Sequence, residues 1–223
     1  MSLVVYTAIT GQYDRLRDPP EDIRGAEDWI GFMDSAHSPT FWQIRPLARR
    51  GDDPCRNAKA YKILSHEYFP DVQYSLWVDG SIEFVMPFAV RELIAYLHDA
   101  DIAIFEHRLR HCLYQEACAC IQQSLDDPEL IYQQMFRYTR AGYPANAGLV
   151  EATVILRRHS PRVREFNNLW WEEIQNGSRR DQLSFNYVAW KTGIKYNLFP
   201  GRLDKNGLFR RHRHHYGSDT ASM

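Results

Sequence analysis

Cysteine is scarce in this sequence of 223 residues, which has four cysteines and no Cys-x-x-Cys pair. The spacing of Cys118 and Cys120 falls in an expected helix, where the two thiols point in different directions. We therefore interpret the cysteines as reduced and structural, and their spacing gives little support for a zinc site.

An excess of charge of either sign is also lacking: 27 Lys and Arg face 28 Asp and Glu, for a formal net charge of -1. No global field then draws the protein to nucleic acid or to an anionic membrane, so a bound anion must be held locally. The sequence has no apolar run long enough to span a bilayer, and MSLVVYTAIT lacks the basic and then apolar build of a signal peptide. We expect a cytoplasmic protein with no transmembrane segment and no nucleic-acid partner.

Apolar β-branched runs alternate with helical patterns, which predicts an α/β fold with a mostly parallel sheet flanked by helices. We expect one domain over residues 1–208, followed by a basic, histidine-rich tail over 209–223 that is mobile or ordered only by a ligand. The expected strands are 3–9, 29–33, 74–79, 101–107, 152–158 and a short one within IKYNLF. The expected helices are 57–68, one that follows Pro87, 114–125, 129–140, one that follows Ser160-Pro161, and 181–192.

In an open α/β sheet, ligands bind outside the carboxyl ends of the strands, so the residues that leave each strand are the candidates for a site. Polar or small residues leave three of the expected strands: Thr7, Thr10, Gly11, Tyr13 and Asp14; Asp79, Gly80 and Ser81; and Glu106, His107 and Arg108. The helix before the third strand begins with Arg56, Asn57 and Lys59, where helix-end amides and cations together suit a phosphate.

Several of these residues also have ordinary structural interpretations. Asp79-Gly80 is a good turn dipeptide after a strand, and Asp181 is well placed to cap a helix. Lys59 is equally compatible with a solvated charge. The histidines of the tail, His212, His214 and His215, are candidate metal ligands or simply part of a solvated basic segment.

Six segments together resemble one known family: VVYTAITGQYD, RNAKAYKIL, SLWVDGSIEF, EHRLRHCLYQEA, ANAGLVEATVILRRHS and RRDQLSFNYVAWKTG. The family was long catalogued as a domain of unknown function and is now described as glycosyltransferase-like, with plant and bacterial relatives associated with mucilage and pectin. It is similar in turn to glycosyltransferases of the GT-A fold, such as glycogenin and the lipopolysaccharide galactosyltransferases. The resemblance runs from about Val4 to the histidine tail and implies a GT-A-like fold.

The resemblance also implies roles for particular residues. Those expected to bind the nucleotide sugar are Thr7, Ala8 and Tyr13 at the nucleoside, Lys59 as the cation before the metal-binding strand, and Asn146 and Gly148 beside the sugar. From their positions near the strand and helix ends, Asn57 and Arg108 join this group. Asp181 and Gln182 match the pair that faces the transferred sugar. Asp79 and His215 match the metal ligands.

The sequence departs from the pattern of these enzymes at Ser81, where they carry a second acid. One acid, a hydroxyl and an imidazole bind Mg²⁺ or Mn²⁺ more weakly than two acids do. A reaction that uses Mn²⁺ or Mg²⁺ and a reaction in which Lys59, Arg108 or the tail arginines neutralise the leaving diphosphate therefore remain alternatives.

The function that we predict is transfer of a sugar from a nucleotide-diphosphate donor, expected to be a UDP-sugar, to an unidentified saccharide, lipid or protein acceptor. Asp181 is then either the general base or the group that orients the donor sugar. The alternatives are an inactive module that binds the nucleotide or sugar without turnover, and a metal-dependent hydrolase built on the histidines and Asp79.

Overall fold

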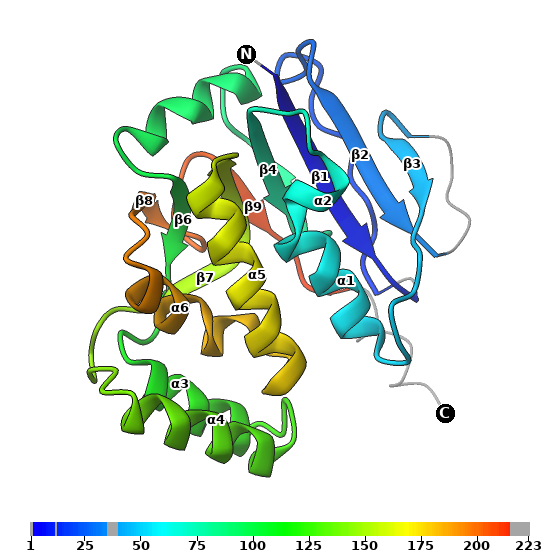
Figure 1. The fold of residues 1–223 in the computed structure, drawn as a ribbon. Coiled ribbons are helices and arrows are strands. Elements are labelled where there is room, and N and C mark those ends of the chain that lie inside the picture. Colours follow the sequence, from blue (N-terminus) through cyan, green and yellow to red (C-terminus); the bar gives the residue numbers. More distant parts are fainter. Residues whose placement is uncertain (1, 12, 35–39, 215–223) are drawn as a thin grey trace.

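The computed structural model of the chain describes residues 2–11, 13–34 and 40–214 (Figure 1). Its centre is a seven-stranded sheet in the order β3-β2-β1-β4-β7-β6-β8, and a small second sheet pairs β5 with β9. The strands are β1 (Leu3–Ile9), β2 (Asp28–Met33), β3 (Gln43–Pro46), β4 (Tyr74–Val78), β5 (Ile82–Phe84), β6 (Ile102–Glu106), β7 (Val150–Arg158), β8 (Tyr196–Arg202) and β9 (Phe209–Arg211).

All pairings in the main sheet are parallel except those of β7, which runs antiparallel to both of its neighbours, β4 and β6. The carboxyl ends of β1, β4 and β6 therefore lie at one edge of the sheet, together with the beginning of β7. The predicted class, an α/β fold with a mostly parallel sheet flanked by helices, is confirmed.

Two hydrophobic cores lie on opposite faces of the sheet, and β1 contributes to both by the two-residue period of a strand. Val4, Tyr6 and Ala8 of β1 join the core that α1, α5 and α6 cover. Leu3 and Val5 join the other core, which β5, β9 and η1 cover. Burial on both faces explains why all seven residues of β1 are buried and why the strand reads as a continuous apolar run.

The helices are α1 (Pro54–Ile63), α2 (Ser65–Tyr68), α3 (Leu113–Gln122), α4 (Pro128–Arg140), α5 (Pro161–Asn176) and α6 (Phe185–Thr192), with two 3₁₀ helices, η1 (Val90–Leu97) and η2 (Asp181–Leu183). Local sequence sets several starts: Asp53, Asp127 and Ser160 accept hydrogen bonds from first-turn amides, each ahead of a proline. Figure 1 shows α3 and α4 below the sheet, on the side where β1 ends. No helix of the described residues is long and apolar enough to cross a membrane.

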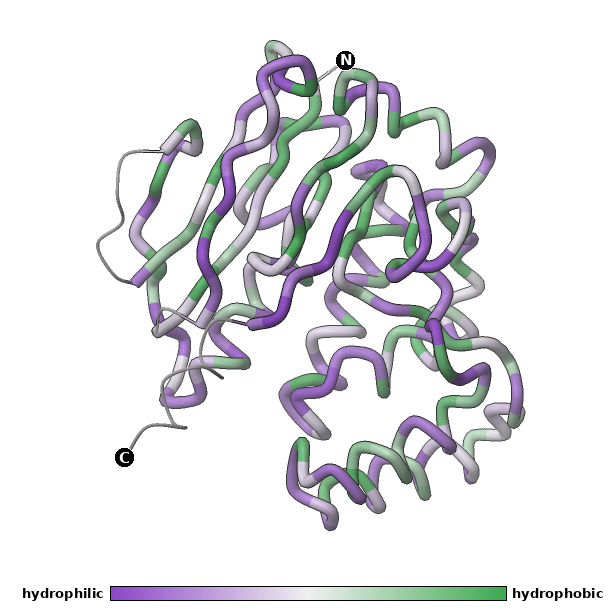
Figure 2. Tube along the Cα trace, turned by 180° about the vertical axis from the view of Figure 1, so that it is seen from behind, coloured by the Kyte–Doolittle hydropathy of each residue, from purple (hydrophilic) through white to green (hydrophobic). Residues whose placement is uncertain are grey.

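Some expected elements differ in detail from those observed. The helix expected over 57–68 is two helices, because Leu64 leaves the helical conformation between them. The one expected over 181–192 is likewise divided at Ser184. The expectation of a mobile tail is wrong for its first residues, since Phe209 is buried and residues 209–211 pair with β5. Figure 2 shows the hydrophilic stretch, in purple, that leads from the body of the protein into the grey C-terminal trace.

His159, directly after β7, gives the fold a specific sensitivity to acid. Its Nε2 lies 2.9 Å from the hydroxyl of Ser75, and burial lowers the pKa of the imidazole to about 4. The unfolded chain takes up this proton near pH 6.5, whereas the folded chain does so only near pH 4, so stability falls as the pH falls between these values. We expect this histidine to account for a loss on the order of 2–3 kcal/mol across that window.

Urea unfolding at pH 7 and pH 4.5, of the wild type and of His159→Gln, measures this contribution. The variant should show a smaller decrease in the free energy of unfolding between the two pH values. An equal decrease in both proteins would assign the acid sensitivity to other groups.

Candidate functional site

A cavity of about 860 Å³ lies at the carboxyl ends of the strands. Its walls come from the loops after β1, β4 and β6, the beginning of β7, the first turns of α1, and η2. Predicted site residues that line it are Ala8, Tyr13, Lys59, Asp79, Arg108, Asp181 and Gln182. Chain segments more than 150 residues apart in sequence thus meet at the edge of the sheet that the strand-end rule indicates.

Asp79 acts both as a turn residue and as an acid of the cavity. Its backbone N–H donates to Thr153 O at 2.8 Å and its carbonyl accepts from Ile82 N at 3.0 Å, which forms the turn after β4. Its carboxylate Oδ1 accepts from Trp77 Nε1 at 2.7 Å and lies 3.2 Å from the Lys62 ammonium. The two interpretations of the Asp-Gly dipeptide are therefore compatible.

Gly80 is required at this turn by close packing. A Cβ at position 80 would lie 2.7 Å from Asp14 Cβ and 2.7 Å from Ile9 Cδ1, which is closer than carbon atoms approach without displacement. We expect Gly80→Ala to lower the free energy of unfolding by about 1–3 kcal/mol, as overpacking in a well-packed site does. Gly51→Ala is the matched control, because nothing lies within 4 Å of a Cβ there.

Urea unfolding of the two alanine variants tests this requirement for glycine. Equal stability of Gly80→Ala and Gly51→Ala would show that the loop after β4 can shift to accommodate a Cβ at position 80 without a loss in the free energy of unfolding.

Asp181 is buried between two lysines of α1. Its Oδ2 lies 2.7 Å from Lys59 Nζ and 2.7 Å from Lys62 Nζ, and Lys62 also reaches Asp79. Burial acts to raise the pKa of the Asp181 carboxyl, but the two ammonium groups outweigh it and hold that pKa well below its usual range. A carboxylate with so little affinity for a proton is a poor general base near neutral pH, whereas it remains a good hydrogen-bond acceptor.

Lys62 joins the two acids into one cluster of charged groups. Burial lowers the pKa of Lys62 and outweighs the effects of Asp181 and Asp79, which raise it. For Lys59 the balance is reversed: burial acts to lower the pKa, and Asp181 is the principal group that raises it above its usual value. We define Lys59, Lys62, Asp79 and Asp181 as the lysine–aspartate cluster.

A second set of charged side chains lines the cavity at the end of β6. His107 Nε2 lies 3.5 Å from Glu116 Oε2 and 4.0 Å from Glu151 Oε1, and all three side chains are buried. Arg108 contacts Glu151 at 3.4 Å, and Arg110 contacts Glu116.

The imidazole of His107 is held in its neutral form. Burial lowers its pKa despite the two neighbouring carboxylates. Its Nδ1 accepts from the backbone amides of Leu109 and Arg110, so the proton of the neutral ring is on Nε2, which faces the acids.

The last described residues close one side of the cavity. His214 Nδ1 lies 2.9 Å from Asp14 Oδ1, and its ring centre is 4.7 Å from that of Tyr13. His212 instead contacts Glu83 at 2.9 Å. His215, which the sequence pattern suggested as a metal ligand, lies outside the described residues.

Four predicted site residues do not line the cavity. Thr7 is fully buried in β1. The amide oxygen of Asn57 accepts from the backbone of Arg50 and Gly51, so this side chain organises the loop before α1. Asn146 and Gly148 both have positive φ, and Gly148 lies near Tyr196 and Asn186. A role of these four in nucleotide-sugar binding stays a prediction.

Other lining residues were not among those predicted. Lys62 is three residues after Lys59 and therefore on the same face of α1, a spacing that the sequence does reveal. Glu116 lies on α3, and Glu151 lies at the beginning of the antiparallel strand β7. Neither position was predicted, because the candidates were taken from the residues that follow the carboxyl ends of the strands.

The metal position predicted at Asp79 and Ser81 holds one carboxylate, already bonded to Lys62 and Trp77, and one hydroxyl. Mg²⁺ takes six ligands in octahedral geometry and usually keeps several waters among them, so Asp79 would be its one charged protein ligand at this position. The Ser81 hydroxyl is buried and has no hydrogen-bond partner in the described part of the chain. Within those ranges, no three His, Cys, Asp or Glu side chains are grouped to hold a metal.

The sheet order, the one antiparallel strand of the main sheet and the cavity at the strand ends define an α/β domain with a ligand cavity at the carboxyl edge of a mostly parallel sheet. The model of the TOD1/MUCI70 glycosyltransferase-like domain family matches residues 32–214, and the chain belongs to this family. The family predicted from the sequence motifs is thus confirmed.

Two curated relatives from Arabidopsis thaliana carry names of different activities. The probable hexosyltransferase MUCI70 is 28% identical over 222 aligned residues, which cover 87% of this chain and 38% of that protein. The alkaline ceramidase TOD1 is 26% identical over 173 residues, which cover 71% of this chain and 37% of that protein. The chain thus spans less than two fifths of the length of the curated relatives it matches.

Solved structures of glycosyltransferases resemble the chain at low identity. Mouse xyloside xylosyltransferase 1 has a TM-score of 0.48 at 12% identity, covering 89% of this chain and 84% of that one. A glycosyltransferase involved in glycosylation of the major capsid of PBCV-1 has a TM-score of 0.47 at 9% identity, covering 95% and 92%.

Proposed function

We propose that this domain is a glycosyltransferase that moves a sugar, a hexose by similarity to MUCI70, from a nucleoside diphosphate donor to an acceptor. The observation that carries the proposal is the lysine–aspartate cluster at the carboxyl ends of the strands, where two cations and two acids face one cavity. Cations suit the phosphates and acids suit sugar or ribose hydroxyls.

The reaction requires stabilisation of the leaving diphosphate. The bond between the anomeric carbon and the diphosphate oxygen breaks, and its electron pair stays with the diphosphate. The acceptor hydroxyl oxygen bonds to the anomeric carbon and loses its proton, which the departing diphosphate oxygen can accept. Lys62, Lys59 and Arg108 line the cavity and can neutralise the negative charge that develops on the leaving group. Mn²⁺ or Mg²⁺ would supply the same neutralisation, with Asp79 as its protein ligand and Ser81 beside it.

Asp181 is the residue that we assign to the donor sugar. Its depressed pKa argues against the general-base role and supports the role of a fixed hydrogen-bond acceptor that orients sugar hydroxyls. Gln182 follows it on η2 and lines the same cavity. Tyr13 and Ala8, at the end of β1, are assigned to the nucleoside, for which uridine is our expectation. A cytoplasmic location stays a prediction from the sequence.

Hydrolysis of an amide, as the name of the ceramidase TOD1 indicates, is the second candidate. Such a reaction needs an activated water or nucleophile, and metal-assisted hydrolases use several side-chain ligands to one ion. The described residues contain no such group of ligands, whereas the two lysines of the lysine–aspartate cluster suit a leaving diphosphate, and this second observation favours transfer.

UDP release from a panel of UDP-sugars, measured beside fatty-acid release from ceramide, tests the proposal. We expect UDP release from at least one UDP-hexose and no ceramide hydrolysis. UDP binding without turnover of any donor would instead establish a binding module, and ceramide hydrolysis without UDP release would establish a hydrolase.

A further inference from the structure

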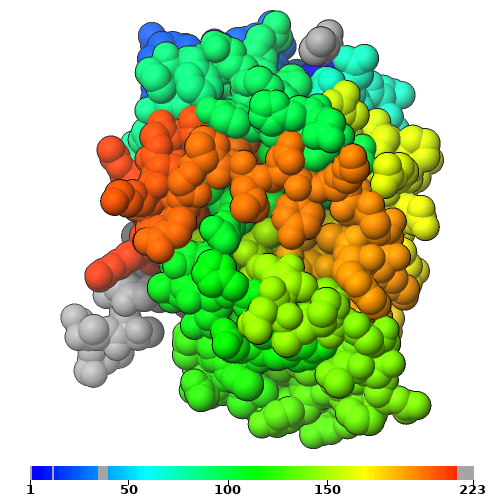
Figure 3. All heavy atoms as spheres, turned by 90° about the vertical axis from the view of Figure 1, so that its left-hand side faces the viewer, coloured from blue at the N-terminus to red at the C-terminus, as the bar shows by residue number. Residues whose placement is uncertain are grey.

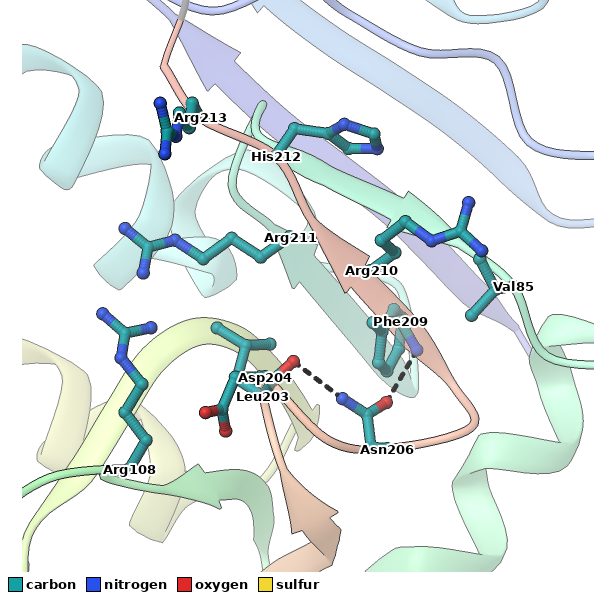
Figure 4. A pocket seen from close by; sticks show the side chains of 10 residues that line it. All are labelled: Val85, Arg108, Leu203, Asp204, Asn206, Phe209, Arg210, Arg211, His212 and Arg213. Atoms are coloured by element: carbon teal, nitrogen blue, oxygen red, sulfur yellow. Dashed lines mark hydrogen bonds between the residues drawn. The ribbon is translucent and has the colours of Figure 1, made fainter.

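A second hollow, of about 570 Å³, adjoins the first and shares part of its charged lining (Figure 4). The segment after β8 and strand β9 form most of its wall. Arg108 and Arg211 line both hollows, so the two share a wall. Figure 3 shows the end of the described chain, in red and orange, on the same side of the molecule as part of the green segment in the middle of the sequence.

The charges of this hollow are unequally compensated. Arg210 and His212 both contact Glu83, at 3.2 and 2.9 Å. Arg211 and Arg213 have no ion-pair partner in the described part of the chain, and Figure 4 shows their side chains extended to the opposite side from Arg210 and His212.

Arg108 reaches toward the same side as Arg211 and Arg213. Its guanidinium is 3.4 Å from Glu151 Oε2, at the wall of the first cavity. The one carboxylate that lines the second hollow, Asp204, is 3.4 Å from Arg202. The hollow therefore holds an excess of positive charge, which we call the arginine hollow.

Arg211 and Arg213, which have no ion-pair partner among the described residues, line one space and repel each other, and a bound oxyanion would remove this repulsion. Guanidinium groups bind carboxylate and phosphate oxygens with paired, charge-assisted hydrogen bonds. The first cavity has its own cations, Lys59 and Lys62, for the donor diphosphate. The arginine hollow is thus available for a second anion beside the donor.

We propose that the arginine hollow binds the acceptor, and that the acceptor carries a carboxylate or phosphate group held by Arg211 and Arg213. The role as acceptor rests on the proposed transferase function, whereas the binding of an anion does not. The shared wall places a molecule held in the hollow next to the donor cavity, as an acceptor hydroxyl requires.

NMR titration of the UDP-saturated protein with glucose 6-phosphate, glucuronate and glucose tests the proposal. We expect one site for at least one of the two anions and none for glucose, and the stronger anion identifies the charged group of the acceptor. Arg213→Gln should weaken anion binding about tenfold or more, which is the effect of losing a charge-assisted hydrogen bond. Arg140→Gln is the matched control, because Arg140 is an exposed residue of α4 that lines neither hollow, and this variant should leave the affinity for the anion unchanged.

Displacement of the anion by UDP would overturn the proposal, because the hollow would then belong to the donor site. An affinity insensitive to both Arg213→Gln and Arg211→Gln, or no anion binding at all, would also overturn it. The same titration without UDP distinguishes failure of this proposal from failure of the transferase proposal. If the protein binds the anion but does not bind UDP, the hollow is still an anion site, and only its role as the acceptor site is removed.

Discussion

Asp181→Asn is expected to abolish sugar transfer and to lower the free energy of unfolding by about 3–5 kcal/mol, the cost of removing one partner from a buried ion pair. Asp181 is 4% exposed and lies 2.7 Å from both Lys59 and Lys62. The amide removes the negative charge and leaves two ammonium groups close together. The acceptor for the sugar hydroxyls is weakened by the same change. UDP release and urea unfolding measure the two losses.

A double variant separates the chemistry from the stability. Asp181→Asn combined with Lys59→Met removes one charge of each sign, so we expect it to regain part of the lost stability without regaining transfer. Asp99→Asn is the control for an exposed ion pair, since Asp99 contacts Lys195 at the surface, and it should change stability by less than about 0.5 kcal/mol. Transfer within tenfold of wild type in Asp181→Asn would contradict the role that we assign to this residue.

Lys62→Met is expected to lower the rate of UDP release about a hundredfold or more when no divalent cation is present. The substitution leaves Asp79 without its cation and removes a positive charge from the wall that faces the leaving diphosphate. Loss of one preorganised charge-stabilising group typically costs a factor of about 10²–10³ in rate. The measurement is UDP release in EDTA, with thermal unfolding to confirm that the variant is folded.

The matched control for this experiment is Lys195→Met, which removes an exposed lysine that does not line the cavity. It should retain wild-type activity. Wild-type activity that EDTA abolishes, together with a small effect of Lys62→Met, would show that a metal ion and not this lysine neutralises the diphosphate.

The sequence predicted the elements whose signal is local. Strands β1 and β4 are buried on both faces and read as continuous apolar runs, and Asp79 directly follows β4. Strand β9 has no such signal, because two of its three residues are arginines and its order comes from pairing with β5.

The site was predictable where it follows from parallel strands. Asp79, Arg108 and Tyr13 lie where their strands end, and they do line one cavity. Glu151 was not predicted, because β7 is antiparallel to its neighbours and therefore reaches the site with its beginning and not with its carboxyl end. Lys62 was not predicted because it lies in the apolar segment AYKIL and because its partners, Asp79 and Asp181, are distant in sequence. These contacts become evident only from the fold.

Calorimetric titration with UDP, with GDP as the control nucleotide, tests most directly that the cavity at the lysine–aspartate cluster is the donor site. We predict one UDP per chain, weaker binding of GDP, and an affinity for UDP at least about tenfold lower in Asp79→Ala, which loses a charge-assisted contact. Absence of UDP binding with and without Mn²⁺, or equal affinity in the wild type and Asp79→Ala, would contradict this prediction and leave Asp79 as a turn residue only.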